Sequence, residues 1–133
     1  MSNLQKHLIT KGECEVLAHE YDTSNYAAIN KIRPSAKPDS KTYTYELEVL
    51  QDYINLIRDG LEKEGVKNKG IKISLGKYPE SGFTDRLDPK YKGYQTVFFT
   101  AVDLDEEKSK NESDKKKGSG GLPGLDFGQL CPP

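Results

Sequence analysis

The clearest hydrophobic pattern lies in the middle of the chain. Apolar side chains recur there at steps of three and four residues, the spacing of one helix face: Leu47, Leu50, Ile54, Ile57 and Leu61. Charged and amide side chains occupy much of the other side, and Gly65 stands where such a helix would end. The pattern predicts an amphipathic helix that buries one face.

A second helix is predicted nearer the N-terminus. Thr10 and Glu13 have the capping-box spacing, in which each side chain bonds a backbone N–H near the helix start. Four residues then share one helix face: Cys14, Leu17, Ala18 and Tyr21. The pattern weakens after Tyr21, so this helix either ends there or continues to about Ile32. Pro34 ends it in either case, because proline disfavours helix in the residue before it.

Two later stretches are typical of strands. Residues 71–75 alternate strictly between apolar and polar, which predicts a strand with one buried face. Residues 95–102 are apolar on both sides, which predicts a more central strand. The short run 42–45 has strand propensity and either joins this sheet or leads into the next helix. We predict an α+β fold with two helices packed on a small antiparallel sheet.

The composition changes sharply after this region. Residues 103–121 hold a single apolar side chain, Leu104, and predict a disordered linker. Apolar residues then return near the C-terminus: Leu122, Leu125, Phe127 and Leu130. Because two strands make a marginal sheet, we predict that this segment docks onto its own domain rather than onto a partner. The predicted organisation is one domain over 1–102, a linker over 103–121 and a docking segment over 122–133.

Charge and cysteine content restrict the class of protein. The net charge is −1 with Lys and Glu interleaved, so we expect no nucleic-acid partner. No apolar run is long enough to span a membrane and no signal peptide is present, so we expect a cytoplasmic protein. Cys14 and Cys131 lack metal or redox spacing, which predicts free thiols, with Cys14 in the core and a disulfide between the two as the alternative. His7 and His19 form no metal-spaced set with them, and we expect no metal or cofactor.

Three segments carry a resemblance to a known family. They read G-I-x-I-x-L-G-x-Y from Gly70, T-V-F-F from Thr96, and G-x-L-C-P-P from Gly128. Together they resemble a family of small flavobacterial and other Bacteroidota proteins with no assigned activity. The resemblance implies a folded domain of bacterial origin, and it brings no functional residue with it.

The long loop over residues 76–94 holds the candidate binding residues. Loops held by a sheet often carry binding groups, and tyrosine offers contact area at little cost in rotamer entropy. The candidates are Lys77, Tyr78, Glu80, Asp85, Arg86, Tyr91 and Tyr94. The alternative is a solvated hairpin connection whose tyrosines pack against the edge of the sheet.

These observations favour a non-catalytic protein-binding or regulatory module of unknown pathway. One alternative is a small-molecule-binding domain that uses the 76–94 loop. Another is a hydrolase that uses the loop carboxylates of Glu80, Asp85 and Asp88. No histidine or nucleophile motif accompanies those carboxylates, so the sequence disfavours an enzyme without deciding the matter.

Overall fold

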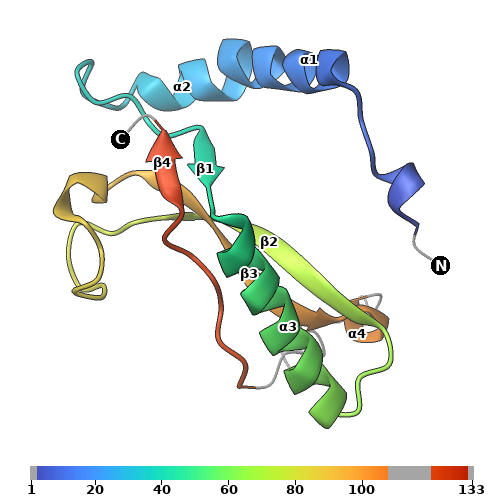
Figure 1. Ribbon diagram of the computed structural model, residues 1–133. Helices are drawn as coiled ribbons and strands as arrows, with labels where there is room; N and C mark the ends of the chain where they lie inside the picture. The colour runs from blue at the N-terminus through green and yellow to red at the C-terminus, as the bar shows by residue number, and fades with distance from the viewer. Residues whose placement is uncertain (1–2, 108–120, 132–133) are drawn as a thin grey trace. The chain divides into compact units, whose positions relative to one another are not determined.

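Helices and two small antiparallel sheets make up the fold, which confirms the α+β prediction (Figure 1). The computed structural model describes residues 3–107 and 121–131. Contacts group the chain into two compact units, Met1–Asp39 and Ser40–Pro133, and each is described by itself below. The division falls inside the single domain that the sequence predicts over residues 1–102.

The first unit is helical. A short 3-10 helix at Leu4–Lys6 precedes α1 (Lys11–Tyr21), which continues through a π-helical turn at Asp22–Tyr26 into α2 (Ala27–Asn30). The predicted capping box begins α1: Thr10 Oγ1 accepts from the Glu13 N–H at 3.0 Å, and Glu13 Oε1 accepts from the Thr10 N–H at 2.8 Å. Of the two ends predicted for this helix, Tyr21 and about Ile32, the later one agrees better with the structure, because helical turns continue to Asn30.

The predicted apolar face of α1 is not buried. Leu17 is 62% exposed, and Cys14 is an exposed free thiol. None of the four helical elements of this unit contains a buried residue, so these elements offer no core for a small thiol to join. The prediction of a core cysteine at position 14 is wrong.

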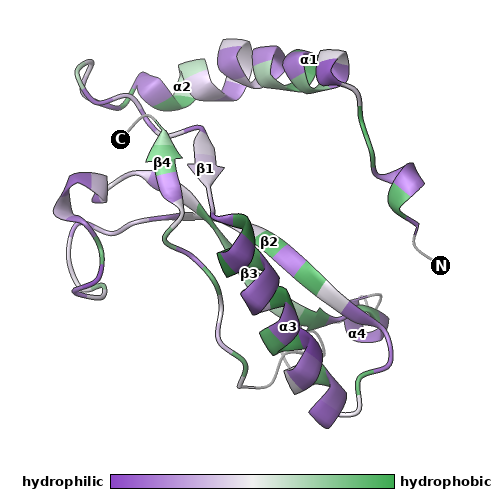
Figure 2. Ribbon diagram, in the orientation of Figure 1, coloured by the Kyte–Doolittle hydropathy of each residue, from purple (hydrophilic) through white to green (hydrophobic). Residues whose placement is uncertain are grey.

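The second unit is built around the helix predicted most clearly. This helix, α3 (Leu47–Lys63), is followed by Gly65 with a φ of +78°, a left-handed conformation that glycine adopts without strain. Strands β2 (Lys69–Lys77) and β3 (Gln95–Asp103) pair antiparallel, with Ile73 opposite Phe99. The helix packs its apolar face on β3, and Figure 2 shows its polar face turned away. The core here consists of Tyr53, Ile57, Leu61 and Ala101, with Val66, Phe99, Leu122 and Leu125 around it.

The apolar face of β2 is exposed, contrary to the prediction of a buried face. Ile71, Ile73 and Leu75 are 40%, 62% and 76% exposed, and Figure 2 shows the alternation as coloured bands along the strand. The cause is the position of α3, whose core contacts fall on Phe99 and Ala101 of β3. Helix α3 covers β3, and the apolar side chains of β2 remain exposed beside it.

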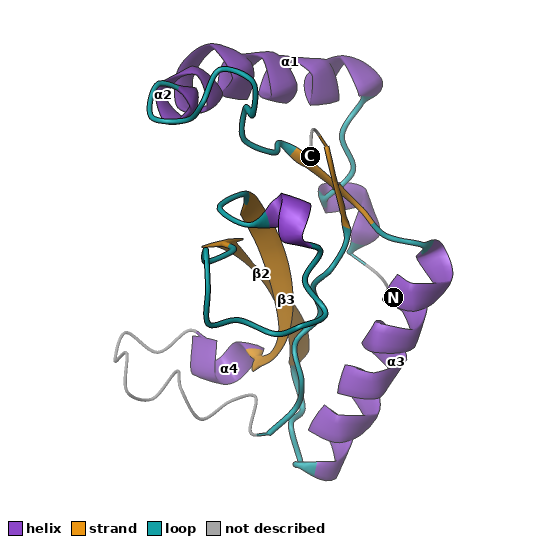
Figure 3. Ribbon diagram, turned by 90° about the vertical axis from the view of Figure 1, so that its left-hand side faces the viewer, coloured by secondary structure: helices purple, strands orange, loops and turns teal. Residues whose placement is uncertain are grey.

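The segment 42–45 does not join the β2–β3 sheet. Instead β1 (Thr42–Thr44) pairs antiparallel with β4 (Gln129–Cys131) in a separate two-stranded sheet (Figures 1 and 3). The Lys41 N–H also donates to the Cys131 carbonyl at 2.8 Å. A second core cluster lies beside this pair and contains Tyr78, Leu87, Tyr94 and Leu130, with Tyr43 and Tyr91 partly buried against it.

The first residues of the predicted linker are folded. Strand β3 runs to Asp103 and is followed by the short helix α4 (Leu104–Glu107). The Leu104 N–H donates to the Asn68 carbonyl at 2.9 Å, and its side chain lies against Gly70. The single apolar residue of the stretch therefore anchors its start, and residues 108–120 of the predicted linker lie outside the described residues.

The C-terminal segment docks on its own unit, as predicted. Leu125 exchanges two backbone hydrogen bonds with Phe99, at 2.8 and 2.9 Å, on the side of β3 away from β2. Leu122 packs against Gly60 of α3, and Leu130 is 1% exposed. Phe127 is only partly covered. The segment thus extends the small β2–β3 sheet and supplies part of both cores.

Candidate ligand-binding site

A cavity of about 340 Å³ lies on the face of the β2–β3 sheet opposite α3. Side chains alternate along a strand, so Thr96 and Phe98 point away from the helix that covers Phe99. The cavity is lined by Gly76, Lys77, Tyr78, Pro79, Phe83, Thr96, Phe98, Gly124, Leu125 and Asp126. Strands, long loop and C-terminal segment all contribute to it.

The long loop is closed at its base by Tyr78. The Tyr78 N–H donates to the Tyr94 carbonyl and the Tyr78 carbonyl accepts from the Gly93 N–H, both at 2.9 Å. A 3-10 helix at Pro89–Tyr91 lies within the loop, capped by the Asp88 carboxylate. These bonds hold the Tyr78 ring in the core while its hydroxyl reaches the cavity floor.

The C-terminal segment brings a carboxylate into the cavity. At Gly124 a Cβ atom would lie 3.0 Å from the Phe99 carbonyl oxygen, so glycine allows the segment to approach β3 closely. The pairing of Leu125 with Phe99 then places the next side chain, Asp126, on the opposite face. Phe127 follows with a φ of +64°, an uncommon value for a residue other than glycine.

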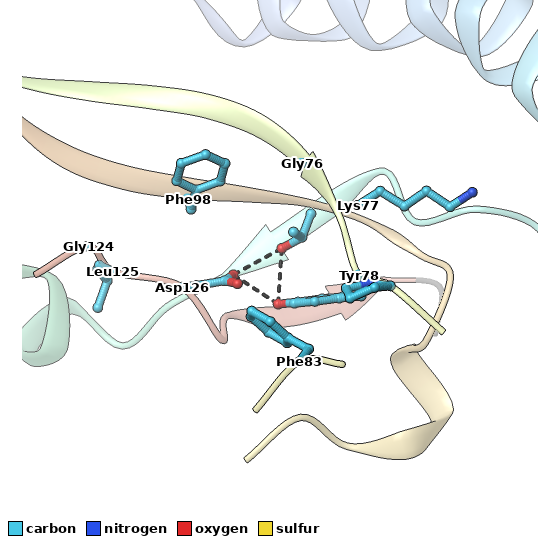
Figure 4. Close-up of a pocket in the computed structure, with 10 residues that line it drawn as sticks. Gly76, Lys77, Tyr78, Phe83, Phe98, Gly124, Leu125 and Asp126 are labelled. Carbon is cyan, nitrogen blue, oxygen red and sulfur yellow. Dashed lines mark hydrogen bonds between the residues drawn. The ribbon is translucent and has the colours of Figure 1, made fainter. Parts of the chain in front are cut away.

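Three side chains form the polar floor of the cavity (Figure 4). The Tyr78 hydroxyl donates to Asp126 Oδ1 at 2.9 Å. The Thr96 hydroxyl lies 3.0 Å from the same carboxylate oxygen and 3.1 Å from the Tyr78 hydroxyl. Among the described residues both hydroxyls thus meet Oδ1, and Oδ2 is left to accept from another donor. Burial, with a smaller effect of the Asp126 charge, raises the pKa of Tyr78 well above its ordinary value, so this phenol stays protonated.

Aromatic rings form the walls. Figure 4 shows Phe83 and Phe98 on opposite sides of the Asp126 carboxylate, and both rings are partly exposed. The Tyr78 and Phe127 rings stack with centroids 6.4 Å apart, and Phe83 lies against both. The Arg86 guanidinium sits 4.9 Å from the centre of the Phe127 ring, where a cation is attracted to an aromatic face.

The structure separates the loop residues that the sequence singled out. Lys77 and Tyr78 line the cavity, although Figure 4 shows the Lys77 side chain directed away from Asp126. Tyr94 is buried and Tyr91 is partly buried in the second core cluster, which is the packing role weighed as the alternative.

The loop carboxylates are not brought to the same cavity. Asp85 lines a second hollow of about 320 Å³ inside the loop, whereas Glu80 is exposed on the surface. Asp88 is also exposed, and its carboxylate accepts from the Lys90 N–H at 3.1 Å. This arrangement gives the hydrolase alternative no support.

Sequence reasoning missed Thr96, Asp126, Phe83 and Phe98 as site residues. Thr96 and Phe98 belong to a strand interpreted for its apolar content alone. Asp126 offered a usable signal, because it is the one charged residue within the apolar segment 122–131. A carboxylate in a segment predicted to dock is a polar group that needs hydrogen-bond partners once it is buried.

The described residues contain neither a candidate metal site nor a membrane-spanning helix. Across residues 3–107 and 121–131, His, Cys, Asp and Glu side chains form no group of three or more placed to hold a metal ion. In the same part of the chain no helix combines the length and apolar content needed to cross a bilayer.

Comparison with protein-family models, curated proteins and solved structures finds no match to this chain. The resemblance to Bacteroidota proteins therefore stays a prediction.

Proposed function

We propose that this chain is a non-catalytic binding domain whose cavity receives a small apolar group carrying a hydrogen-bond donor. The observation that carries the proposal is the Asp126 carboxylate, held by two hydroxyls in a cavity with aromatic walls. Mostly apolar cavities of a few hundred Å³ with a few fixed polar groups are the usual form of ligand sites.

The lining residues indicate what the ligand must look like. Asp126 Oδ2 accepts a hydrogen bond, and an amine would form the stronger charge-assisted one. Phe83 and Phe98 favour a ring or a compact aliphatic body between them, because aromatic pairs gain energy beyond burial of area. The ligand class is therefore a small aromatic or cyclic amine, free or as part of a partner protein.

The proposal differs from the protein-binding module favoured by the sequence in where recognition occurs. The sequence predicted that the C-terminal segment docks onto its own domain. Leu125 and Leu130 engage the chain's own strands, so this segment contributes to the site. A bacterial origin, from the resemblance, and a cytoplasmic location remain part of the proposal.

The test compares two phenols that differ only in the amino group, the donor proposed to reach Asp126. Isotope-labelled full-length protein is titrated with tyramine and with 4-ethylphenol while amide resonances are followed by NMR. We expect tyramine to shift Thr96, Phe98 and Asp126 and to bind at least ~10-fold tighter, since a hydrogen bond to a charged group contributes roughly 1.5–3 kcal/mol. Asp126→Asn keeps an acceptor for the two hydroxyls but removes the charge, and should abolish the preference.

Asp85→Asn is the matched control, because it removes the same charge from a residue that lines the second hollow and not this cavity. It should leave tyramine binding unchanged. Equal affinity for both probes, or no shifts at the cavity residues, would contradict the proposal.

A displayed peptide library distinguishes the two sources of the ligand group. Enrichment of peptides with Lys or Arg beside an aromatic residue, lost with Asp126→Asn, would point to a partner protein. Tyramine binding without such enrichment would point to a free small molecule.

A further inference from the structure

The outer edge of β2 presents unpaired backbone groups among the described residues. Both backbone groups of Phe99 bond Leu125 on the far side of β3. Phe99 therefore makes no ladder bond to Ile73, its partner in β2. Ile73 and Phe99 therefore form a non-hydrogen-bonded pair, in which the backbone N–H and C=O groups of each residue point away from the other strand. Ile73 thus directs its N–H and C=O to the open side of the sheet.

Bonds at both ends of β2 establish the same alternation. The Asn68 carbonyl accepts from the Leu104 N–H, just past the end of β3. Both backbone groups of Tyr78 bond the segment that leads into β3. Even-numbered residues therefore face β3, and the odd-numbered Ile71 and Leu75 share the outward orientation of Ile73.

The outward residues are also the exposed apolar ones. Ile71, Ile73 and Leu75 combine free backbone groups with apolar side chains that α3 does not cover. Such an edge is a template for pairing with another strand unless charges block it. Lys72 points to the opposite face of the sheet, and its ammonium lies 2.8 Å from Glu107 Oε2. Lys69, at the end of the strand, is 3.0 Å from Glu62 Oε2.

We propose that β2 pairs with β2 of a second copy of this chain across a two-fold axis at Ile73. The two β2–β3 pairs would then form one continuous antiparallel sheet of four strands. Ile73 lies opposite Ile73 of the second copy, and Ile71 lies opposite Leu75 of the second copy. Each of these pairs exchanges two backbone hydrogen bonds, because the outward N–H and C=O groups of one β2 face those of the other β2. A symmetric contact of this type closes at two chains.

Charge and shape favour a second copy as the occupant. In this register Lys72 lies opposite Ser74 of the second copy, so like charges meet only where Lys69 and Lys77 face each other at the ends. Leu75 of the second copy arrives beside Ile71, which lines a groove of about 210 Å³ with Ile54 and Ile57 of α3. Residues 108–120 hold no apolar side chain that could cover this face instead.

Sedimentation of the full-length chain tests the proposal. We expect the mass to rise with concentration from 14.9 kDa toward twice that value. Ile73→Lys places two like charges opposite each other at the axis and should weaken association at least ~10-fold. Leu56→Lys, at an exposed apolar position of α3, should leave association unchanged. A chain that stays monomeric up to about 1 mM overturns the proposal, as does unchanged association of a folded Ile73→Lys variant.

A charge exchange tests the register. Ile71→Lys and Leu75→Glu should each weaken association, because each places a charge opposite an apolar side chain. Both substitutions in one chain create two opposite-charge pairs across the axis and should recover at least ~10-fold of the loss. Circular dichroism shows that each variant is folded before its mass is measured. Failure of the double variant to recover overturns the proposed pairing.

Discussion

Replacing Leu130 with alanine is expected to destabilise the protein by about 2–5 kcal/mol, the range for truncating a buried leucine. Leu130 is 1% exposed and packs with Tyr78, Leu87 and Tyr94. It lies near the end of the chain, beyond a stretch that holds little apolar content, where a free tail would contribute nothing to stability. A large loss in the free energy of unfolding would therefore show that β4 belongs to the core.

The measurement is urea unfolding followed by circular dichroism, with Leu47→Ala as the matched control. Leu47 is 84% exposed at the start of α3, so its truncation should change stability by less than about 0.5 kcal/mol. If Leu130→Ala lowers the free energy of unfolding as little as Leu47→Ala does, the docking of β4 is refuted.

Replacing Gly128 with alanine is expected to cost roughly 1–3 kcal/mol, as overpacking in a well-filled region does. A Cβ atom there would lie 2.6 and 2.7 Å from two carbons of the Tyr45 ring. That ring packs edge-on against Phe99, with centroids 5.4 Å apart. The cost is steric, because the clash is with a ring rather than with the end of a flexible side chain.

A double-mutant cycle separates this clash from other effects of the substitution. In a Tyr45→Leu background the ring is gone, and Gly128→Ala should cost less than half as much in urea unfolding. An equal cost in both backgrounds would mean that the C-terminal segment does not pass against Tyr45.

The helices could be predicted because their signals are local. The Thr10–Glu13 capping box lies within one turn, the apolar side chains of α3 recur from each turn to the next, and Gly65 marks the end of α3 with its positive φ. The β2–β3 pairing also followed from pattern alone. The helices depend on neighbours a few residues away, which a sequence shows directly.

The burial of β2 could not be predicted in the same way. Alternation shows that Ile71, Ile73 and Leu75 share one face, but not whether another layer covers that face. The position of α3 over β3 decides that question, and it depends on the packing of Tyr53 and Ile57 against Ala101. Exposure of a face with a buried-strand pattern is what suggests an interface between two copies.

The candidate site was missed for a related reason. Its carboxylate and its hydroxyls lie far apart in the chain, and they meet only because Leu125 pairs with Phe99. The sequence favoured the loop tyrosines as site residues because they lie close together along the chain. In the structure most of them pack in the second core cluster. A polar residue in a docking segment is a better indicator of a site than a polar loop.

The central claim is that the C-terminal segment pairs with β3 and so completes the cavity around Asp126. Amide hydrogen exchange of the full-length protein measures this directly. The Phe99 N–H donates to the Leu125 carbonyl at 2.8 Å, and the Leu125 N–H donates to the Phe99 carbonyl at 2.9 Å. We predict that both amides are protected to a similar degree, well above the rate for an unstructured peptide. A Leu125 amide that exchanges at the unstructured rate while Phe99 stays protected would contradict the account.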